Sequence, residues 1–389
     1  MGETPMISKK ISLILLVSVG IATVPNLRAQ AANGGAKTEP KAEPDVLIFT
    51  DGEKLIGQLV RSNGASLTFK SDMAGEVTVD WGKVQELHTH RPFAVVKKDV
   101  KLRKKETDGQ IPRGDIDASS GTIRVAGSAG QPPAAIPVAE TGYVLDETTF
   151  EKAVLSRPGI FAAWKGAVSA GASLVTATQN SRTFTGAVSL IRAVPTETWL
   201  DPRNRTSFNY SSSYGKLSQP GKPDLRTAIY HADGERDQYF TPRLYGFGQL
   251  AYDHNSSQGL DLQQNYGGGV GWTVLKSAVQ TLDLKSGLSY VAQQFQTAQA
   301  NQNLLGSTFA ERYDRKLPAS MLLDQQLSVT PAWNNTRAYS AGGSTTLTIP
   351  VYKRLSLSLA AIDTFLNNPP PTFKKNSFQF TTGLTYTLP

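Results

Sequence analysis

Apolar and polar residues alternate with a period of two along the second half of the chain, which indicates β-strands with one apolar face. In residues 376–388 one face holds Phe378, Phe380, Thr382, Leu384, Tyr386 and Leu388. Residues 345–349 and 355–361 repeat this alternation. The opposite face carries small uncharged residues, and charges are expected at segment ends. A soluble sandwich also alternates, but this polar face is more typical of a transmembrane barrel.

The alternation divides this half into twelve segments, which predicts an antiparallel transmembrane β-barrel of about 12 strands. The segments are 161–178, 183–193, 206–216, 226–235, 238–254, 260–275, 278–294, 307–317, 321–333, 338–349, 355–365 and 376–388. Ten or fourteen strands stay open if segments merge or split. Leu355, Leu357 and Leu359 are expected to face lipid, with Ser356 and Ser358 facing the lumen. Aromatic residues near segment ends predict interfacial girdles, for example Tyr239, Phe240, Tyr245, Tyr266, Trp272, Tyr290 and Phe295.

Short apolar runs with turn signals in residues 45–140 predict a separate small β-domain of four or five strands. Asp51-Gly52, Asn63-Gly64 and Ala74-Gly75 mark its bends. Residues 127–142 are dense in Pro, Gly and Ala, so we end the domain there. Residues 141–157 then form a linker, with one or two helical turns over 146–155, and the barrel occupies 158–389. The fold class is therefore all-β, in two domains.

The first 31 residues have the features of a secretory signal peptide. Lys9 and Lys10 precede an apolar run over residues 11–24, and Ala29-Gln30-Ala31 is a cleavage site. A membrane anchor is the alternative, but this run is shorter than the ~20 residues that a spanning helix needs. We expect cleavage after Ala31, followed by a linker over 32–44 of a composition that cannot bury a core.

Composition limits the chemistry of the 389-residue chain. Cysteine is absent, which excludes disulfides, thiolate metal sites, thiol nucleophiles and a lipid-modified N-terminal cysteine. Charged residues make up 19%, and 34 glycines accompany many aromatic, Ser, Thr and Gln residues, as in turns and half-exposed strands. The net charge of +8 suits contact with anionic lipid or glycan, and an exported protein is not expected to meet nucleic acid.

Four local patterns invite a functional interpretation, and each has a structural alternative that we prefer. His88 and His90 share one strand face and could chelate a metal, but no third ligand is near. Residues 253–259, DHNSSQG, combine Asp, His and Ser as a hydrolase does, or form a turn. GGGVG at 267–271 indicates close strand packing, not a phosphate cradle. The basic run 97–105 fits a lysine-protected edge strand or contacts anionic head groups.

The C-terminal half resembles a known family in a series of aromatic, Gly and Asp positions. These lie in Trp164-Lys165-Gly166, GERDQYFTPRLYGFGQLAYDHNSSQGLDLQQNYGGGVGW, LKSGLSYVAQQF and SFQFTTGLTYTL. Residues 160–388 resemble the outer-membrane family called domain of unknown function 481, which includes the salt-induced outer-membrane proteins. The resemblance implies a barrel inserted by the barrel assembly machinery, and carries no catalytic motif. Residues 45–102, with DGEKLIGQL and VTVDWGKVQEL, resemble an Sm-like small barrel.

Together these observations predict an outer-membrane barrel, structural or pore-forming, with its small domain in the periplasm. The small domain is expected to dock on peptidoglycan or an envelope protein, and the barrel to contact lipid and lipopolysaccharide. We assign no catalytic, metal-binding or cofactor-binding residue, and expect neither a cofactor nor enzyme activity. Two alternatives stay open: an outer-membrane hydrolase with Ser, His and an acid at one lumen rim, and a soluble periplasmic β-rich binding module.

Overall fold

The computed structural model describes residues 43–100, 111–127, 132–156, 159–176, 180–197 and 199–388. The signal peptide and almost all of the 32–44 linker lie outside these residues and stay predictions. Residues 101–105 of the basic run also lie outside them.

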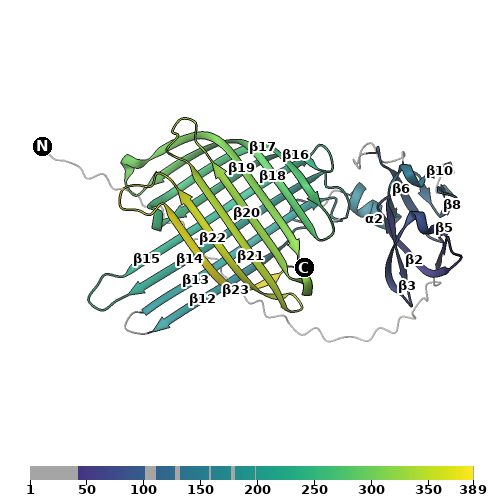
Figure 1. Ribbon diagram of the computed structural model, residues 1–389, viewed down its shortest axis with the longest axis horizontal. Coiled ribbons are helices and arrows are strands. Elements are labelled where there is room, and N and C mark those ends of the chain that lie inside the picture. The colour runs from purple at the N-terminus through teal and green to yellow at the C-terminus, as the bar shows by residue number, and fades with distance from the viewer. Residues whose placement is uncertain are drawn as a thin grey trace, which may run out of the picture. The chain divides into compact units, whose positions relative to one another are not determined.

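The larger domain is a closed antiparallel barrel of twelve strands, each paired with its neighbours along the chain, which confirms the predicted fold (Figure 1). The strands are β12 (Lys165–Thr176), β13 (Asn180–Val194), β14 (Asn204–Ser218), β15 (Leu225–Tyr239), β16 (Leu244–Asn255), β17 (Leu260–Lys276), β18 (Gln280–Phe295), β19 (Gln302–Lys316), β20 (Leu322–Thr330), β21 (Ser340–Tyr352), β22 (Leu355–Leu366) and β23 (Asn376–Thr387). We call the end at which β12 begins the entry end, and the opposite end the far end.

The barrel closes where β12 meets β23, and this seam is short. Residues 167–170 pair with residues 384–387, whereas β12 pairs with β13 along its whole length. Ser169 and Thr385, 216 residues apart in the chain, hydrogen-bond across the seam at 2.7 Å. Gly171 and Gly383 permit this approach, because a Cβ on either would lie within 2.7 Å of a backbone oxygen of the other strand.

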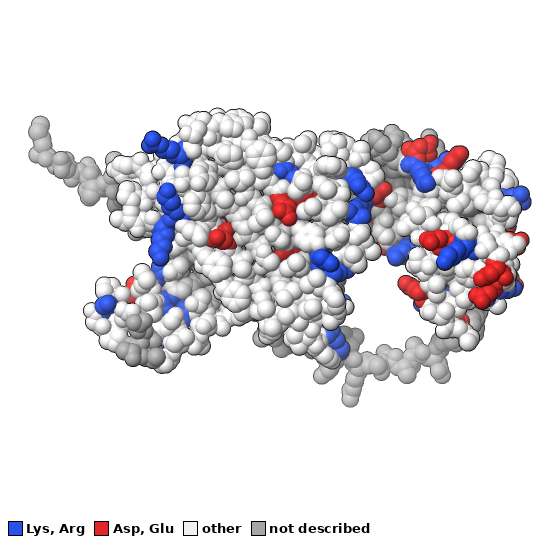
Figure 2. All heavy atoms as spheres, in the orientation of Figure 1, with Lys and Arg blue, Asp and Glu red and all other residues white. Residues whose placement is uncertain are grey.

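Strand register places the two faces of each strand as the alternation predicts. Leu357 pairs with Leu384, which is 54% exposed, while Ser358 pairs with Gly383 and is buried. Antiparallel partners share a face, so Leu355, Leu357 and Leu359 point outward with the exposed apolar residues of β23. On the side seen in Figure 2, the barrel strands carry few charged side chains. The outer surface therefore has the apolar character that lipid requires.

Several exposed aromatic side chains lie near the two ends of the strands on this outer surface, and others, such as Tyr210 and Phe309, lie between them. Those toward the entry end include Trp272, Tyr352 and Tyr386, and those toward the far end include Tyr230, Tyr252, Tyr266 and Tyr290. Aromatic rings with a polar atom are favoured at the two boundaries between lipid and water. The predicted girdles are thus confirmed for Phe240, Tyr266, Trp272 and Tyr290. The prediction is wrong for Tyr245 and Phe295, which are buried.

The smaller domain begins with five strands in the order β5-β1-β2-β3-β4. They are β1 (Asp45–Phe49), β2 (Lys54–Ser62), β3 (Ser66–Ser71), β4 (Gly75–Asp80) and β5 (Val84–His88). Alternate residues bury one face around Leu47, Leu59, Leu67, Phe69 and Leu87. Gly64 makes the β2–β3 turn with φ of +85°, and a Cβ there would lie 2.4 Å from the Thr141 oxygen. The Sm-like resemblance stays a prediction.

The sheet of this domain continues beyond the four or five strands predicted. It adds β6 (Phe93–Lys97), β7 (Arg113–Gly114), β8 (Ile116–Ser119), β9 (Thr122–Val125), β10 (Ala134–Pro137) and β11 (Thr141–Asp146). Residues 141–157, expected as a linker, contain β11, which pairs with both β2 and β6. Its inward side chain Val144 is 1% exposed in the same core as Leu47. The strand therefore belongs to the small domain.

A short helical segment follows β11, as the sequence predicts. The α-helical turn α2 (Glu147–Phe150) continues into a π-helical turn (Glu151–Leu155). The Asp146 carboxylate accepts a hydrogen bond from the Thr149 amide at 3.0 Å and caps the first turn. Within the described residues, no helix is long and apolar enough to cross a membrane.

Candidate functional site

The inner face of the barrel wall carries most of the ionisable side chains that pair with one another. Away from the strand termini at the entry end, register places on this face the carboxylates Asp233, Glu235, Asp237, Asp253, Asp283, Asp314 and Asp324, and the cations Arg205, Lys285 and Arg312. At those termini it also places Lys165, Lys276 and Lys316 on the inner face. Among these side chains the carboxylates outnumber the cations. The expectation of an uncharged polar face with charges at strand ends is therefore wrong for β15, β18 and β19. Ion pairing offsets the desolvation of these charges.

Arg205 of β14 is the centre of the cluster nearer the entry end. Its Nε donates to Asp237 Oδ2 at 2.6 Å and its Nη2 to Asp283 Oδ2 at 2.8 Å. Both carboxylates are 1% exposed. The guanidinium also lies 5.4 Å from the ring centre of Tyr245 and 5.9 Å from that of Tyr239. One cation thus holds together carboxylates from β15 and β18, which lie on different parts of the wall.

Two further cations extend this cluster around the wall. Lys285 on β18 pairs with Glu235 on β15, and both side chains are nearly buried. Arg312 on β19 contacts Asp314 and Asp324, each at 3.2 Å. Asp314 on β19 and Asp324 on β20 are direct cross-strand neighbours, so their two carboxylates lie close together. Arg312 lowers the repulsion between them.

Alternate glycines of the GGGVG sequence, Gly267, Gly269 and Gly271, lie on the same inner face, and Gly271 makes room for an aromatic ring of β16. A Cβ on Gly271 would lie 2.3 Å from the Tyr245 ring, which is fully buried. Gly287 on β18 makes room for the Phe247 ring in the same way, because a Cβ on Gly287 would lie 3.1 Å from that ring. These glycines therefore serve close packing inside the barrel, as the sequence indicates.

A chain of hydrogen bonds runs along the wall nearer the far end, with His231 near its middle. His231 Nδ1 lies 2.6 Å from Asp253 Oδ1, and Nε2 lies 3.0 Å from Asp233 Oδ1. Amide side chains continue the chain on both sides: Asn209, Gln263, Gln293, Gln302 and Asn335. Donors and acceptors from β14 to β19 are thereby satisfied by one another.

The turn between β16 and β17 reaches across the lumen to strands on another part of the wall. The Gln258 amide donates to the Thr364 oxygen at 3.1 Å and the Lys375 oxygen at 2.8 Å. Ser257 Oγ donates to Ser377 Oγ at 3.2 Å. Gln258 is 3% exposed, and Gly259 lies against the Phe373 ring. We call residues 255–259 the cross-lumen turn.

Residues 253–259, the hydrolase candidate, do not bring an acid, a histidine and a serine together. Asp253 points into the lumen, whereas His254 points outward, stacks near Tyr230 and lies 2.8 Å from the Asp261 oxygen. Ser256 accepts a hydrogen bond from the Ala228 amide. The segment is the strand end and turn that its composition favours.

His88 and His90 are likewise separated from any common ligand position. His88 Nδ1 lies 2.7 Å from Asp117 Oδ1, and Nε2 lies 3.2 Å from Glu86 Oε2, so the carboxylates occupy both nitrogens of the ring. His90 is exposed, beyond the end of β5. The described residues contain no group of three His, Asp or Glu side chains suited to a metal ion.

The environment of His88 makes the stability of the small domain depend on pH. The hydrogen bonds to Asp117 and then to Glu86 raise the pKa of His88 above its usual 6.5. The stabilisation of the folded small domain by protonated His88 is therefore complete below pH 6.5, and it is lost as pH rises through the raised pKa of His88. We expect His88→Gln to increase hydrogen exchange of β1, β5 and β8 at pH 5.5 and to leave it unchanged at pH 9.

The size of this effect is limited, because the ring is 43% exposed. Exposed ion pairs contribute about 0.2–1 kcal/mol. The full chain should be used, with exchange of β21 in the barrel as the internal control. An equal effect of His88→Gln at both pH values would contradict the assignment.

The described part of the basic run lies at the end of β6. Lys97 Nζ is 3.9 Å from Glu140, and Lys98 Nζ donates to the Ala139 oxygen at 2.7 Å. These contacts tie the run to the segment before β11. Contact of the run with anionic partners stays a prediction.

Comparison with solved structures finds outer-membrane barrels of very low sequence identity. The NanC porin is 6% identical, with a TM-score of 0.35, over 57% of this chain and all of the porin. The COG4313 outer-membrane channel from Pseudomonas putida F1 is 13% identical, with a TM-score of 0.34, over 60% of this chain and all of the channel. The β-domain of the Bordetella autotransporter BrkA is 9% identical, with a TM-score of 0.30, over 58% of this chain and 98% of that domain.

A comparison with curated proteins finds no significant match. The profile of one family matches residues 168–388, which span β12 to β23 and more than half of the chain. The resemblance stated from the sequence is thereby confirmed. The chain belongs to the family described as Protein of unknown function, DUF481.

Proposed function

We propose that this protein is an outer-membrane channel that prefers small cationic solutes over anions. The observation that supports the proposal is the excess of carboxylates over lysine and arginine side chains on the inner wall, away from the strand termini at the entry end. Fixed charges of one sign raise the local concentration of oppositely charged solutes in a narrow pore. A lumen with more carboxylates than basic groups therefore favours the passage of cations.

The width of the barrel agrees with a channel. Eight strands enclose a space that wall side chains fill, and the diameter grows roughly in proportion to strand number. Twelve strands consequently enclose more space than wall side chains alone occupy. The charged cluster around Arg205 narrows the lumen, and the cross-lumen turn spans it nearer the far end. We infer that this arrangement conducts little and that release of the turn widens the path.

The proposal is tested by recording single channels of the full protein in planar bilayers. Under a potassium chloride gradient, we expect a reversal potential that corresponds to a several-fold preference for potassium over chloride. Asp233→Asn combined with Asp253→Asn should reduce this preference. Gln258→Ala should raise the open fraction, because it removes the two hydrogen bonds to the Thr364 and Lys375 oxygens.

Gln325→Ala is the matched control, since Gln325 lies on the outer face of β20 and should change neither property. Anion preference of the wild type would contradict the proposed selectivity. Silence of both the wild type and Gln258→Ala would favour a structural role for the barrel.

We also propose that the small domain lies in the periplasm and docks on peptidoglycan or an envelope protein. The lysines at the end of β6 support contact with an anionic partner. We propose no enzyme activity, because the Asp, His and Ser side chains of residues 253–259 point in different directions.

A further inference from the structure

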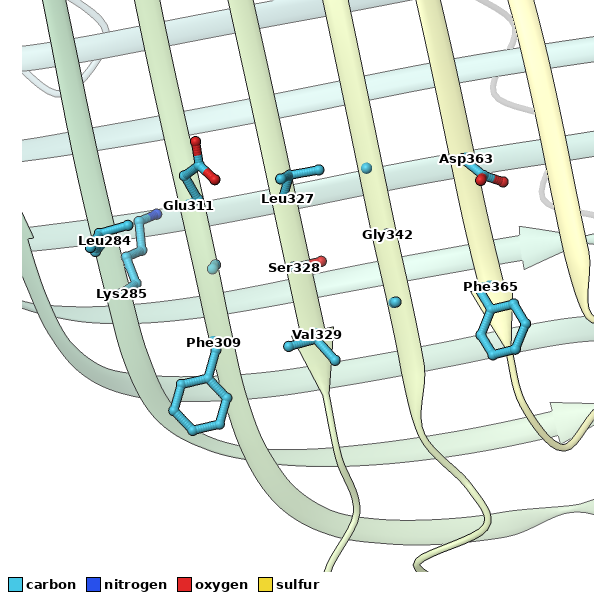
Figure 3. Close-up of a pocket in the computed structure, with 13 residues that line it drawn as sticks. Leu284, Lys285, Phe309, Glu311, Leu327, Ser328, Val329, Gly342, Asp363 and Phe365 are labelled. Atoms are coloured by element: carbon cyan, nitrogen blue, oxygen red, sulfur yellow. The ribbon is translucent and has the colours of Figure 1, made fainter.

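The outer surface of the barrel is hollowed over β18 to β22, and Figure 3 shows the side chains that line this groove. Its volume is about 640 Å³, within the range of pockets that hold small molecules. We call it the outer groove. Aromatic and aliphatic side chains form its sides, chiefly Phe309, Leu327, Val329 and Phe365.

Register shows that the outer groove faces lipid and not the lumen. Phe309 pairs with Val329, and both are exposed, as is Leu327. Leu327 pairs with Gly343, and Gly343 pairs with Asp363, so these residues share the outer face. Ala341 and Gly343 are small, so the outer groove is deepest over β21, between Leu327 on β20 and Phe365 on β22.

Two carboxylates, Glu311 and Asp363, lie at opposite sides of the outer groove (Figure 3). Both belong to the outer face, since Glu311 pairs with Leu327 and Asp363 with Gly343. Within the described residues, neither carboxylate makes a hydrogen bond or an ion pair. A charged group on a surface that faces lipid is costly unless a partner neutralises it.

Glu311 lies close to one boundary of the apolar surface. The next outward residue toward the entry end is Tyr313, whose hydroxyl donates to Gln280 Oε1 at 2.9 Å. Gln280 is the first residue of β18. The exposed Trp272 on β17 and Glu311 on β19 lie at similar distances from the ends of their strands. Such aromatic residues mark the level of lipid head groups. The Glu311 carboxylate can therefore meet a head group while the rest of the groove meets acyl chains.

We propose that the outer groove binds a phospholipid with a primary-amine head group. The ammonium group donates hydrogen bonds to Glu311, and one acyl chain lies over Ala341 and Gly343 toward Phe365. The amine neutralises a carboxylate that has no partner among the described residues, and the acyl chain fills a hollow that is lined by apolar side chains. This proposal is independent of conduction through the lumen.

Native mass spectrometry of the full protein in detergent micelles tests the proposal. Phosphatidylethanolamine, phosphatidylcholine and phosphatidylglycerol are titrated separately. We expect phosphatidylethanolamine to bind about tenfold or more tightly than the other two, since its ammonium group donates charge-assisted hydrogen bonds to a carboxylate. The quaternary ammonium of phosphatidylcholine has no hydrogen to donate, and the hydroxyls of phosphatidylglycerol carry no positive charge. Glu311→Gln should reduce its affinity to that of phosphatidylcholine. Ala341→Phe should abolish binding by filling the groove.

Ala172→Phe is the matched control, because Ala172 is an exposed alanine on the outer face of β12 and lies outside the groove. Folding of every variant is checked by heat-modifiable gel mobility, and Glu311→Gln changes no side-chain volume. Equal affinity for the three lipids, or unchanged affinity in Glu311→Gln, would overturn the proposal. So would a dimer of this chain that Ala341→Phe dissociates, since a second copy would then occupy the groove.

Discussion

Leu359→Arg is expected to prevent most of the protein from inserting as a folded barrel, whereas Ser358→Arg should insert almost normally. Leu359 lies near the middle of β22 and shares the outer face with Leu347 and Thr382. An arginine at mid-membrane depth on this face costs about 2–4 kcal/mol, a factor of roughly 30 to 1,000 in the folding equilibrium. Ser358 faces the lumen, where carboxylates are in excess.

The measurement is the folded fraction after refolding into vesicles, read from heat-modifiable gel mobility. The two substitutions are neighbours in the chain and introduce the same side chain, so each controls for local effects of the other. Equal loss in both variants would mean that β22 does not separate lipid from lumen.

Removal of the Arg205 side chain is expected to be the most destabilising single change inside the barrel. Arg205→Met leaves Asp237 and Asp283 facing each other without a cation, while both stay 1% exposed. Breaking a buried charge network in this way costs about 3–5 kcal/mol. We expect the urea midpoint of unfolding, followed by tryptophan fluorescence in vesicles, to fall accordingly.

Two further variants show whether the loss arises from uncompensated charge. Adding Asp237→Asn and Asp283→Asn to Arg205→Met should restore much of the stability, because no buried charge is then unpaired. Arg236→Met is the matched control on the outer face of β15, where the guanidinium contacts only Thr206 Oγ1 among the described residues. If Arg236→Met destabilised the barrel as much as Arg205→Met, the proposed role of Arg205 would be wrong.

The barrel strands could be predicted because dyad alternation is a local property of the sequence. Residues 376–388 and 355–361 each show their two faces without knowledge of any neighbour. Boundaries were less accurate where charged residues interrupt the pattern. The prediction placed a gap at Arg236 and Asp237, whereas β15 runs without interruption from Leu225 to Tyr239.

The charged lumen was missed for the same reason. Glu235 and Asp237 alternate with Gly234 and Arg236, a period of two that indicates an inner charged face, but a run of charges is also typical of a strand end. The pairing of Arg205 with Asp283 depends on which strands face each other across the barrel, and local patterns do not contain this information. The cross-lumen turn is likewise a contact between residues more than a hundred positions apart.

In the small domain, very short strands were missed. β7 has two residues, and β8, β9 and β10 have four each. Such runs are too short to establish a periodicity, and the Pro, Gly and Ala residues around β10 are typical of a boundary. Tertiary pairing with longer strands stabilises them, as β5 does for β8.

The short seam between β12 and β23 has a consequence for the order of assembly. Every other pair of neighbouring barrel strands is adjacent in the chain and can form as a hairpin, with little loss of chain entropy. The seam must instead bring Ser169 to Thr385 across the whole length of the barrel sequence, and it gains few backbone hydrogen bonds in return. We therefore expect closure of this seam to be the last and slowest step of folding, with the nascent sheet open along these two edges until it occurs.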